Sequence, residues 1–245
     1  MKILKRLLSV TFWLSLALYL FLLVWKIPLP SSDLIRPELT TFDPVQTAIK
    51  QAPYIWHVKD QSYRITPLFD YETVGLVVAE YDSQNWLDYS HKQDPAQTKD
   101  LCLIWGENIK NGVYRGLKYS HGEFTCFVNW TEDQGKIFDF NRLSNNHLLP
   151  ASSKPAALIK SSSVGDQVRI KGRLVNYEIL DKDGKIISTR KTSTIRQDRG
   201  CEVIMVDDFE ILQKQPLPVQ AIKSILPKLL FFNGLTNFIL FLLVP

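Results

Sequence analysis

A chain of 245 residues has room for one domain of roughly 150–200 residues besides any membrane segments. All 25 acidic residues and 25 of the 29 basic ones lie between residues 27 and 228, so this middle part is formally neutral. A nucleic-acid-binding domain normally carries a basic surplus, because neutralising phosphates supplies much of its affinity. The charge distribution therefore argues against a general nucleic-acid binder, and the net charge of +4 lies around the N-terminus.

The first predicted element is a membrane helix. Residues 7–25 carry no charge and follow Lys2, Lys5 and Arg6. About 20 apolar residues cross a hydrocarbon core of roughly 30 Å, and basic residues before the first span keep the N-terminus in the cytoplasm. No small-residue cleavage site follows the apolar run, which favours an uncleaved signal anchor over residues 1–27 rather than a signal peptide.

Residues 28–60 are punctuated by five prolines and predict a Pro-rich spacer with one short helix at 44–51. Residues 61–214 form the predicted β domain. Its first strands are expected at 63–65, 74–81, 101–105 and 124–130, where β-branched and aromatic residues gather. A hairpin turn at 133–136 would lead into a strand at 137–140. A short helix is expected at 154–161, with Pro155 in its first turn.

The clearest strand pattern alternates apolar and polar side chains over residues 168–179, with Gly172 in the middle. A turn at 181–184 leads to a strand at 186–190, and residues 201–212 supply the last strand. The pattern at 165–175 looks like the opening strand of an OB-like barrel, in which a mid-strand glycine lets one strand serve both sheets. The fold class is thus mainly β (α+β), a small OB-like or SH3-like barrel with one short helix.

After a linker at 215–228, residues 229–245 are again uncharged, and Asn233, Gly234 and Asn237 interrupt them. We expect a second transmembrane helix that packs on the first through this face; an interfacial helix is the alternative. Lys223 and Lys228 favour the opposite orientation, but the first helix usually sets topology. The predicted location is the bacterial inner (plasma) membrane, with the domain facing the periplasm or the cell exterior.

Three segments, 100–106, 122–126 and 200–202, resemble parts of uncharacterised bacterial membrane-anchored proteins. The resemblance extends over residues 60–212 and implies no activity.

The loop after the strand at 74–81 holds candidate catalytic residues, namely Asp82, Asp88 and His91. Carboxylates in unequal environments can act as acid and base beside an imidazole. The alternative, which we favour, is a polar surface loop.

Five basic side chains are candidates for binding an anionic glycan, a lipid headgroup or a phosphate. They are Lys171, Arg173, Arg190, Arg196 and Arg199. The alternative for the run at 190–199 is a solvated hairpin loop.

The three cysteines, Cys102, Cys126 and Cys201, suit one disulfide and one odd thiol. Both Cys102–Cys126 and Cys126–Cys201 are open, because spacing does not choose between them. The four histidines show no zinc-type spacing, so we predict no bound metal and no cofactor.

These observations favour a membrane-anchored binding module outside the cytoplasm, with a membrane or envelope protein as its partner in an envelope assembly. An envelope hydrolase using Asp82, Asp88 and His91 is one alternative. An OB-like binder of nucleic acid or anionic glycan is the other.

Overall fold

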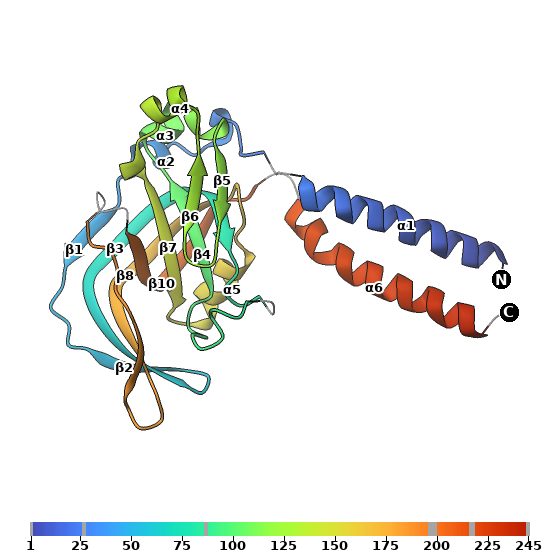
Figure 1. Cartoon of the computed structure of the whole chain (residues 1–245). Helices are drawn as coiled ribbons and strands as arrows, with labels where there is room; N and C mark the ends of the chain where they lie inside the picture. Colours follow the sequence, from blue (N-terminus) through green and yellow to red (C-terminus); the bar gives the residue numbers. More distant parts are fainter. Residues whose placement is uncertain (1, 26–27, 86–87, 196–199, 216–218, 244–245) are drawn as a thin grey trace. The chain divides into compact units, whose positions relative to one another are not determined.

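The computed structural model describes residues 2–25, 28–85, 88–195, 200–215 and 219–243 (Figure 1). The chain forms two compact units. One combines Met1–Pro28 with Pro216–Pro245, and the other is Leu29–Gln215. Residues 29–60, for which the sequence predicted a spacer, therefore belong to the second unit.

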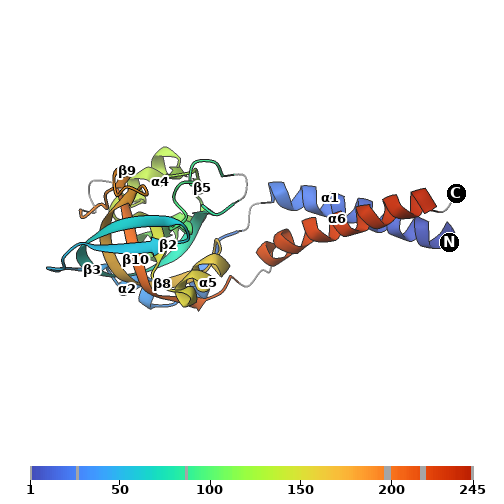
Figure 2. The same cartoon turned by 90° about the horizontal axis from the view of Figure 1, so that it is seen from below.

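The first unit is a pair of helices, α1 (Lys2–Val24) and α6 (Val219–Leu243), which lie side by side in both views (Figures 1 and 2). The Asn233 side chain donates to Thr11 Oγ1 at 3.0 Å, and that of Asn237 donates to the Leu8 carbonyl at 3.3 Å. A side chain at Gly234 would meet the Phe12 ring at 3.3 Å. The polar face predicted to join the two helices is therefore in contact with α1.

Among the described helices, α1 is long and apolar enough to cross a membrane, over Lys5–Leu22. This is compatible with a membrane anchor or with a signal sequence. The apolar part of α6, Ile225–Leu240, is shorter. Because α6 begins at Val219, it also includes residues that the sequence assigned to a linker.

The second unit is mainly β, with one large mixed sheet and one small sheet. The strands of the large sheet are β1 (Val45–Ala48), β2 (Tyr54–Val58), β3 (Gln61–Tyr81), β4 (Lys99–Ile104), β7 (Leu143–Pro150), β8 (Gln167–Leu180), β9 (Ile186–Arg190) and β10 (Cys201–Gln213). The small sheet pairs β5 (Lys118–His121) with β6 (Cys126–Asn129). Short helical segments complete the unit, namely Ser32–Leu34, α2 (Glu38–Thr41), α3 (Glu107–Lys110), Val113–Arg115, α4 (Glu132–Ile137), Phe140–Arg142 and α5 (Ser153–Ser161).

Five strands pair in a closed circuit, from β3 to β4, β7, β10, β8 and back to β3. The β7–β10 pair is parallel and the other four are antiparallel. The long strand β3 makes this closure, because Ser62–Leu76 pairs with β8 while Leu76–Tyr81 pairs with β4. Figure 1 shows the strong curvature of β3 and β8 that accompanies this pairing.

Alternation along β4 separates two of the three apolar cores of this unit. Leu101 and Leu103 of β4 face an interior to which all five strands of the circuit and Ile159 of α5 contribute. Cys102 and Ile104 face the opposite side, where the segment between β4 and β7 covers them. This is the period of two that a strand imposes on its side chains. The outer face of β4 is therefore covered rather than solvated.

Several predicted elements are confirmed. The structure has α5 at the predicted helix, β9 at residues 186–190, and β8 and β10 over the two longer predicted strands. The sequence placed an opening strand at 165–175. This is wrong, because β8 follows β3, β4 and β7 in the chain.

Three local predictions are wrong. The helix expected at 44–51 is strand β1, because Val45–Ala48 pairs with residues of β3 and gains tertiary hydrogen bonds that outweigh local propensity. The hairpin turn expected at 133–136 is helix α4, because Thr131 and Gln134 form a capping box at its start. The strand expected at 137–140 is likewise absent, and residues 140–142 form a helical turn.

Candidate functional site

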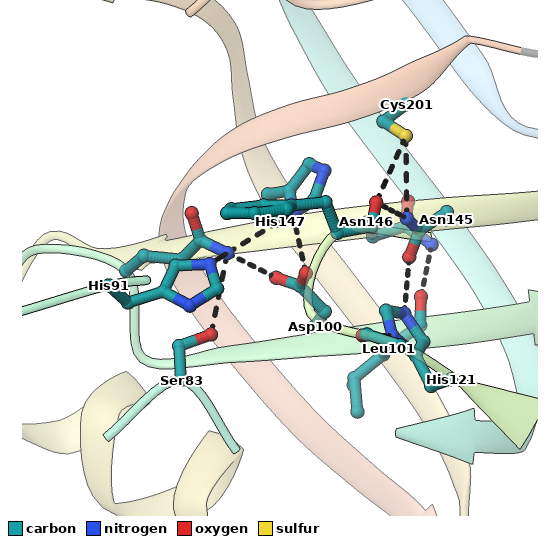
Figure 3. A network of polar contacts seen from close by, with 12 residues as sticks. Ser83, His91, Asp100, Leu101, His121, Asn145, Asn146, His147 and Cys201 are labelled. Atoms are coloured by element: carbon teal, nitrogen blue, oxygen red, sulfur yellow. Dashed lines mark hydrogen bonds and ion pairs between the residues drawn. The ribbon is translucent and has the colours of Figure 1, made fainter. Parts of the chain in front are cut away.

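A buried polar layer lies on the outer face of β4 and β7. Register places Asp100 opposite His147, and their side chains meet with 2.7 Å between Oδ2 and Nδ1 (Figure 3). Gln97, just before β4, donates from Nε2 to Asp100 Oδ1 at 2.8 Å. All three side chains are almost completely buried. The pairing of the two strands therefore builds the first Asp–His pair of the layer.

A second Asp–His pair comes from the loop between β3 and β4. Asp88 Oδ2 lies 2.5 Å from His91 Nδ1, and Asp88 Oδ1 accepts the backbone N–H groups of Ser90 and His91. His91 Nε2 lies 3.2 Å from Gln97 Nε2. An imidazole that donates from Nδ1 to a carboxylate has a lone pair on Nε2, so it accepts from the Gln97 amide. Gln97 thus links the two Asp–His pairs.

Burial and hydrogen bonds shift the pKa values of His147 and Asp88 in this layer. Burial lowers the pKa of His147, against the opposing effect of Asp100, so its imidazole is neutral at pH 7. Burial raises the pKa of Asp88, but the hydrogen bonds from the His91 backbone and side chain outweigh it, so that its pKa is lowered. The Asp88 carboxylate is therefore charged and hydrogen-bonded, as buried charges need to be.

The layer continues from β7 to the small sheet and to β10. His121 Nε2 contacts Asn145 Oδ1 at 2.7 Å, and Asn145 Nδ2 donates to Cys201 Sγ at 3.3 Å and to the Phe124 carbonyl at 3.0 Å (Figure 3). The Tyr81 ring stacks on His121 and also contacts His91. Three of the four histidines of the chain therefore share one layer.

Beside this layer lies an aromatic cavity of about 300 Å³. Its aromatic walls are Trp105, Phe127, Trp130 and Phe140, and the cavity is also lined by Thr125, Cys126, Val128, Leu143, Asn145, Gly200, Cys201 and Glu202. Trp105 is buried, whereas Phe127 and Trp130 are about half exposed. Burial raises the pKa of the Cys201 thiol, and the hydrogen bond from Asn145 opposes this.

A smaller polar cavity of about 200 Å³ lies at the loop between β3 and β4. Ser83, Asp88, His91 and Gln97 are among its lining residues. Of the three predicted catalytic residues, the structure brings together Asp88 and His91. Asp82 is exposed, does not line this cavity and caps a turn by accepting the Gln84 backbone N–H at 3.0 Å.

The predicted basic residues do not converge on one ligand site. Lys171 lies 3.4 Å from Glu72, and Arg173 makes two hydrogen bonds with Asp207 at 2.7 and 3.2 Å. The Arg190 guanidinium instead lies 5.0 Å from the centre of the Phe124 ring, at the polar layer. Arg196 and Arg199 lie outside the described residues.

The structure chooses between the two open cysteine pairings. Cys102 and Cys126 form a disulfide with their Cα atoms 5.9 Å apart, and Cys201 is a free thiol. Among the described residues, no group of three or more His, Cys, Asp or Glu side chains is arranged to hold a metal ion.

Sequence reasoning missed most of the polar layer. Gln97, Asp100, His121, Asn145 and His147 were not singled out, although four of them lie in or beside strands that face each other. The one available signal is the run Asn145–Asn146–His147 between Leu143 and Leu148. Polar residues in such numbers, bounded by leucines, are unusual for a buried strand.

Comparisons with known protein families, with curated proteins and with solved structures found no match for this chain. Any assignment of function to this chain therefore rests on the geometry of its site.

Proposed function

We propose that this chain is a membrane-anchored binding protein whose β domain takes an apolar or aromatic group of its ligand or partner into the aromatic cavity. The observation that carries the proposal is the composition of that cavity, with Phe127 and Trp130 half exposed and Asn145 and Cys201 among its polar lining. Binding sites for small molecules are typically apolar hollows with a few polar groups that fix orientation.

The pairing circuit supports an OB-like barrel. Taken in chain order, β3, β4, β7, β8 and β10 are five strands, α5 falls between the third and fourth, and the third is parallel to the fifth. The parallel pair favours an OB-like over an SH3-like arrangement. OB-folds bind ligands at the face of their second and third strands and at the adjoining loops. In this numbering those strands are β4 and β7, which carry the polar layer.

The location we propose is the outer side of a bacterial inner membrane. The basic residues before α1 favour a cytoplasmic N-terminus, and a domain that follows a single span then lies outside. The Cys102–Cys126 disulfide supports this, since disulfides persist in oxidising compartments. The partner we propose is a membrane or envelope protein that presents an apolar side chain to the cavity.

Ligand-observed fluorine NMR with 4-fluorophenol tests the proposed cavity, with the full chain held in lipid nanodiscs. The probe is small, soluble and aromatic. We expect its signal to broaden with the wild type, and its affinity to fall about tenfold with Trp130→Ala, which corresponds to about 1.4 kcal/mol. Tyr89→Ala removes an exposed aromatic ring elsewhere and is the matched control. Equal broadening by wild type and Trp130→Ala would count against the cavity.

A second candidate is hydrolysis, favoured by the 2.5 Å contact of Asp88 with His91 in a cavity that Ser83 also lines. A base needs a free nitrogen directed at the substrate. Here His91 uses Nδ1 for Asp88 and Nε2 for Gln97, so a structural role fits its contacts better. Hydrolysis of p-nitrophenyl acetate at equal rates by wild type and His91→Asn would eliminate this candidate.

Binding of nucleic acid or of an anionic glycan is the least favoured function. Acidic neighbours already neutralise Lys171 and Arg173, so the strand that carries them offers little net positive charge.

A further inference from the structure

The three cysteines are placed around one residue of β7. Cys102 of β4 and Cys201 of β10 are the register partners of Asn145 on its two sides. Residues opposite each other in a sheet project from the same face, so both sulfurs lie on the outer face. Two strand spacings separate their Cα atoms by roughly 10 Å, which is beyond the reach of a disulfide. Cys102 and Cys201 can therefore share a partner but cannot bond to each other.

Cys126 lies next to both of these cysteines. It bonds to Cys102, and it also lines the aromatic cavity together with Cys201. Cys201 Sγ lies 3.8 Å from the carbonyl of Phe124, which is two residues before Cys126. The free thiol therefore contacts the same segment that the disulfide fastens to β4.

The β5–β6 hairpin that carries Cys126 forms a sheet of its own, separate from the ladder of β4, β7 and β10. The disulfide, side-chain contacts such as Asn145 to Phe124, and the packing of Tyr119 and Val128 on the outer apolar core hold it over the large sheet. A shift of this hairpin from β4 toward β10 would therefore break no ladder of backbone hydrogen bonds with the large sheet.

We propose that Cys201 is an internal nucleophile for the Cys102–Cys126 disulfide, and that the resulting exchange closes the aromatic cavity. The Cys201 thiolate attacks Cys126 Sγ, the Cys126–Cys201 bond forms, the Cys102–Cys126 bond breaks, and Cys102 leaves as a thiolate that takes up the proton given up by Cys201. The number of disulfides is unchanged, so no oxidant or reductant is consumed.

The closing of the cavity follows from its lining, since the new bond would join two residues that both line it. This part rests on the proposed function, whereas the exchange itself does not. Burial raises the pKa of Cys201, so the reactive thiolate is a minor form at neutral pH. We therefore expect exchange to accelerate about tenfold for each pH unit below the pKa of the thiol.

Peptide mapping of the full chain without reduction tests the exchange. The protein is incubated at pH 8.5, quenched with acid, alkylated with N-ethylmaleimide and digested with trypsin, which places the three cysteines in separate peptides, 100–110, 119–136 and 200–214. We expect alkylated Cys102 to accumulate together with the linked peptides of Cys126 and Cys201. Cys201→Ser is the matched control and should give no alkylated Cys102. Alkylation of Cys201 alone in the wild type would overturn the proposal.

The variant Cys102→Ala tests the Cys126–Cys201 bond by itself, because these are the two cysteines that remain. Oxidation with glutathione disulfide should link them, and two free or glutathione-capped thiols would contradict the exchange. The linked variant should also lose binding of 4-fluorophenol and regain it on reduction. If it links but still binds the probe, cavity closure is wrong while exchange stands. If the wild type never binds the probe, the proposed function fails, and the mapping still decides the exchange.

Discussion

At the scale of single residues, the protein stabilises a layer of histidines and carboxylates by giving each a defined hydrogen bond. Asp100 Oδ1 accepts from Gln97, Asp100 Oδ2 lies 2.7 Å from His147 Nδ1, and Asp88 is hydrogen-bonded to His91. Removing one partner of a buried charge costs more than the bond itself contributed, because the remaining charge stays desolvated. Through Gln97, the layer therefore links the loop between β3 and β4 to β7 by contacts that depend on the protonation of His147.

This gives a prediction for pH. The pKa of His147 is lowered in the folded chain, so the unfolded chain binds more protons once the pH falls below its ordinary value of about 6.5. The stability that the neutral imidazole contributes is thus present above that pH and is lost below it. We expect the thermal midpoint of the full chain in detergent to fall between pH 8 and pH 5.5.

His147→Gln keeps an N–H donor for Asp100 but does not titrate, so it should reduce this pH dependence. His57→Gln alters an exposed histidine on β2 and should leave it unchanged. The explanation fails if the thermal midpoint of His147→Gln falls between pH 8 and pH 5.5 by as much as the midpoints of the wild type and of His57→Gln.

At the scale of elements, the backbones of β8 and β10 approach each other closely at Gly172. A Cβ atom on Gly172 would lie 2.0 Å from the Met205 carbonyl oxygen, next to the register shift between Val206 and Asp208. Backbone cannot rotate away as a side chain can, so only glycine fits there. The mid-strand glycine that the sequence indicated is required for this approach of two strands.

Gly172→Ala should therefore destabilise the β domain by about 1–3 kcal/mol or more, the usual cost of overpacking. Gly116→Ala is the matched control, because its Cβ would meet only the end of the flexible Gln134 side chain within 3 Å. Thermal unfolding followed by near-ultraviolet circular dichroism measures both. Equal loss of stability in the two variants would show that the contact with Met205 is not the cause.

Elements with a strong local signal were predictable. β8 alternates apolar and polar residues, β9 follows a turn, and α5 has Pro155 in its first turn. β7 was missed because Ser144 to His147 are polar, and only its position between β4 and β10 makes it a strand. β1 was also missed because its strand conformation depends on tertiary pairing, since its hydrogen bonds come from distant residues of β3.

At the scale of the whole molecule, the site is assembled from segments far apart in sequence. Asp88 and His91 could be suggested as a pair because three residues separate them. Their link to Asp100 and His147 depends on the register of β4 against β7, which no local pattern states. The disulfide was undecided for the same reason, because only the fold determines which cysteine lies next to Cys126.

The division of the chain into a helical unit and a β unit was readable from the charge distribution and the apolar runs. Everything proposed for the β domain, from the oxidised Cys102–Cys126 pair to an envelope partner, requires it to lie outside the cytoplasm.

Labelling with a membrane-impermeant maleimide in spheroplasts tests this requirement most directly. In a Cys201→Ser background, Tyr89→Cys places a thiol at an exposed position of the β domain, and Lys2→Cys places one at the first residue of α1, ahead of its apolar span. We predict that Tyr89→Cys is labelled in intact spheroplasts, whereas Lys2→Cys is labelled only after lysis. The reverse pattern would put the domain in the cytoplasm and contradict the proposed location.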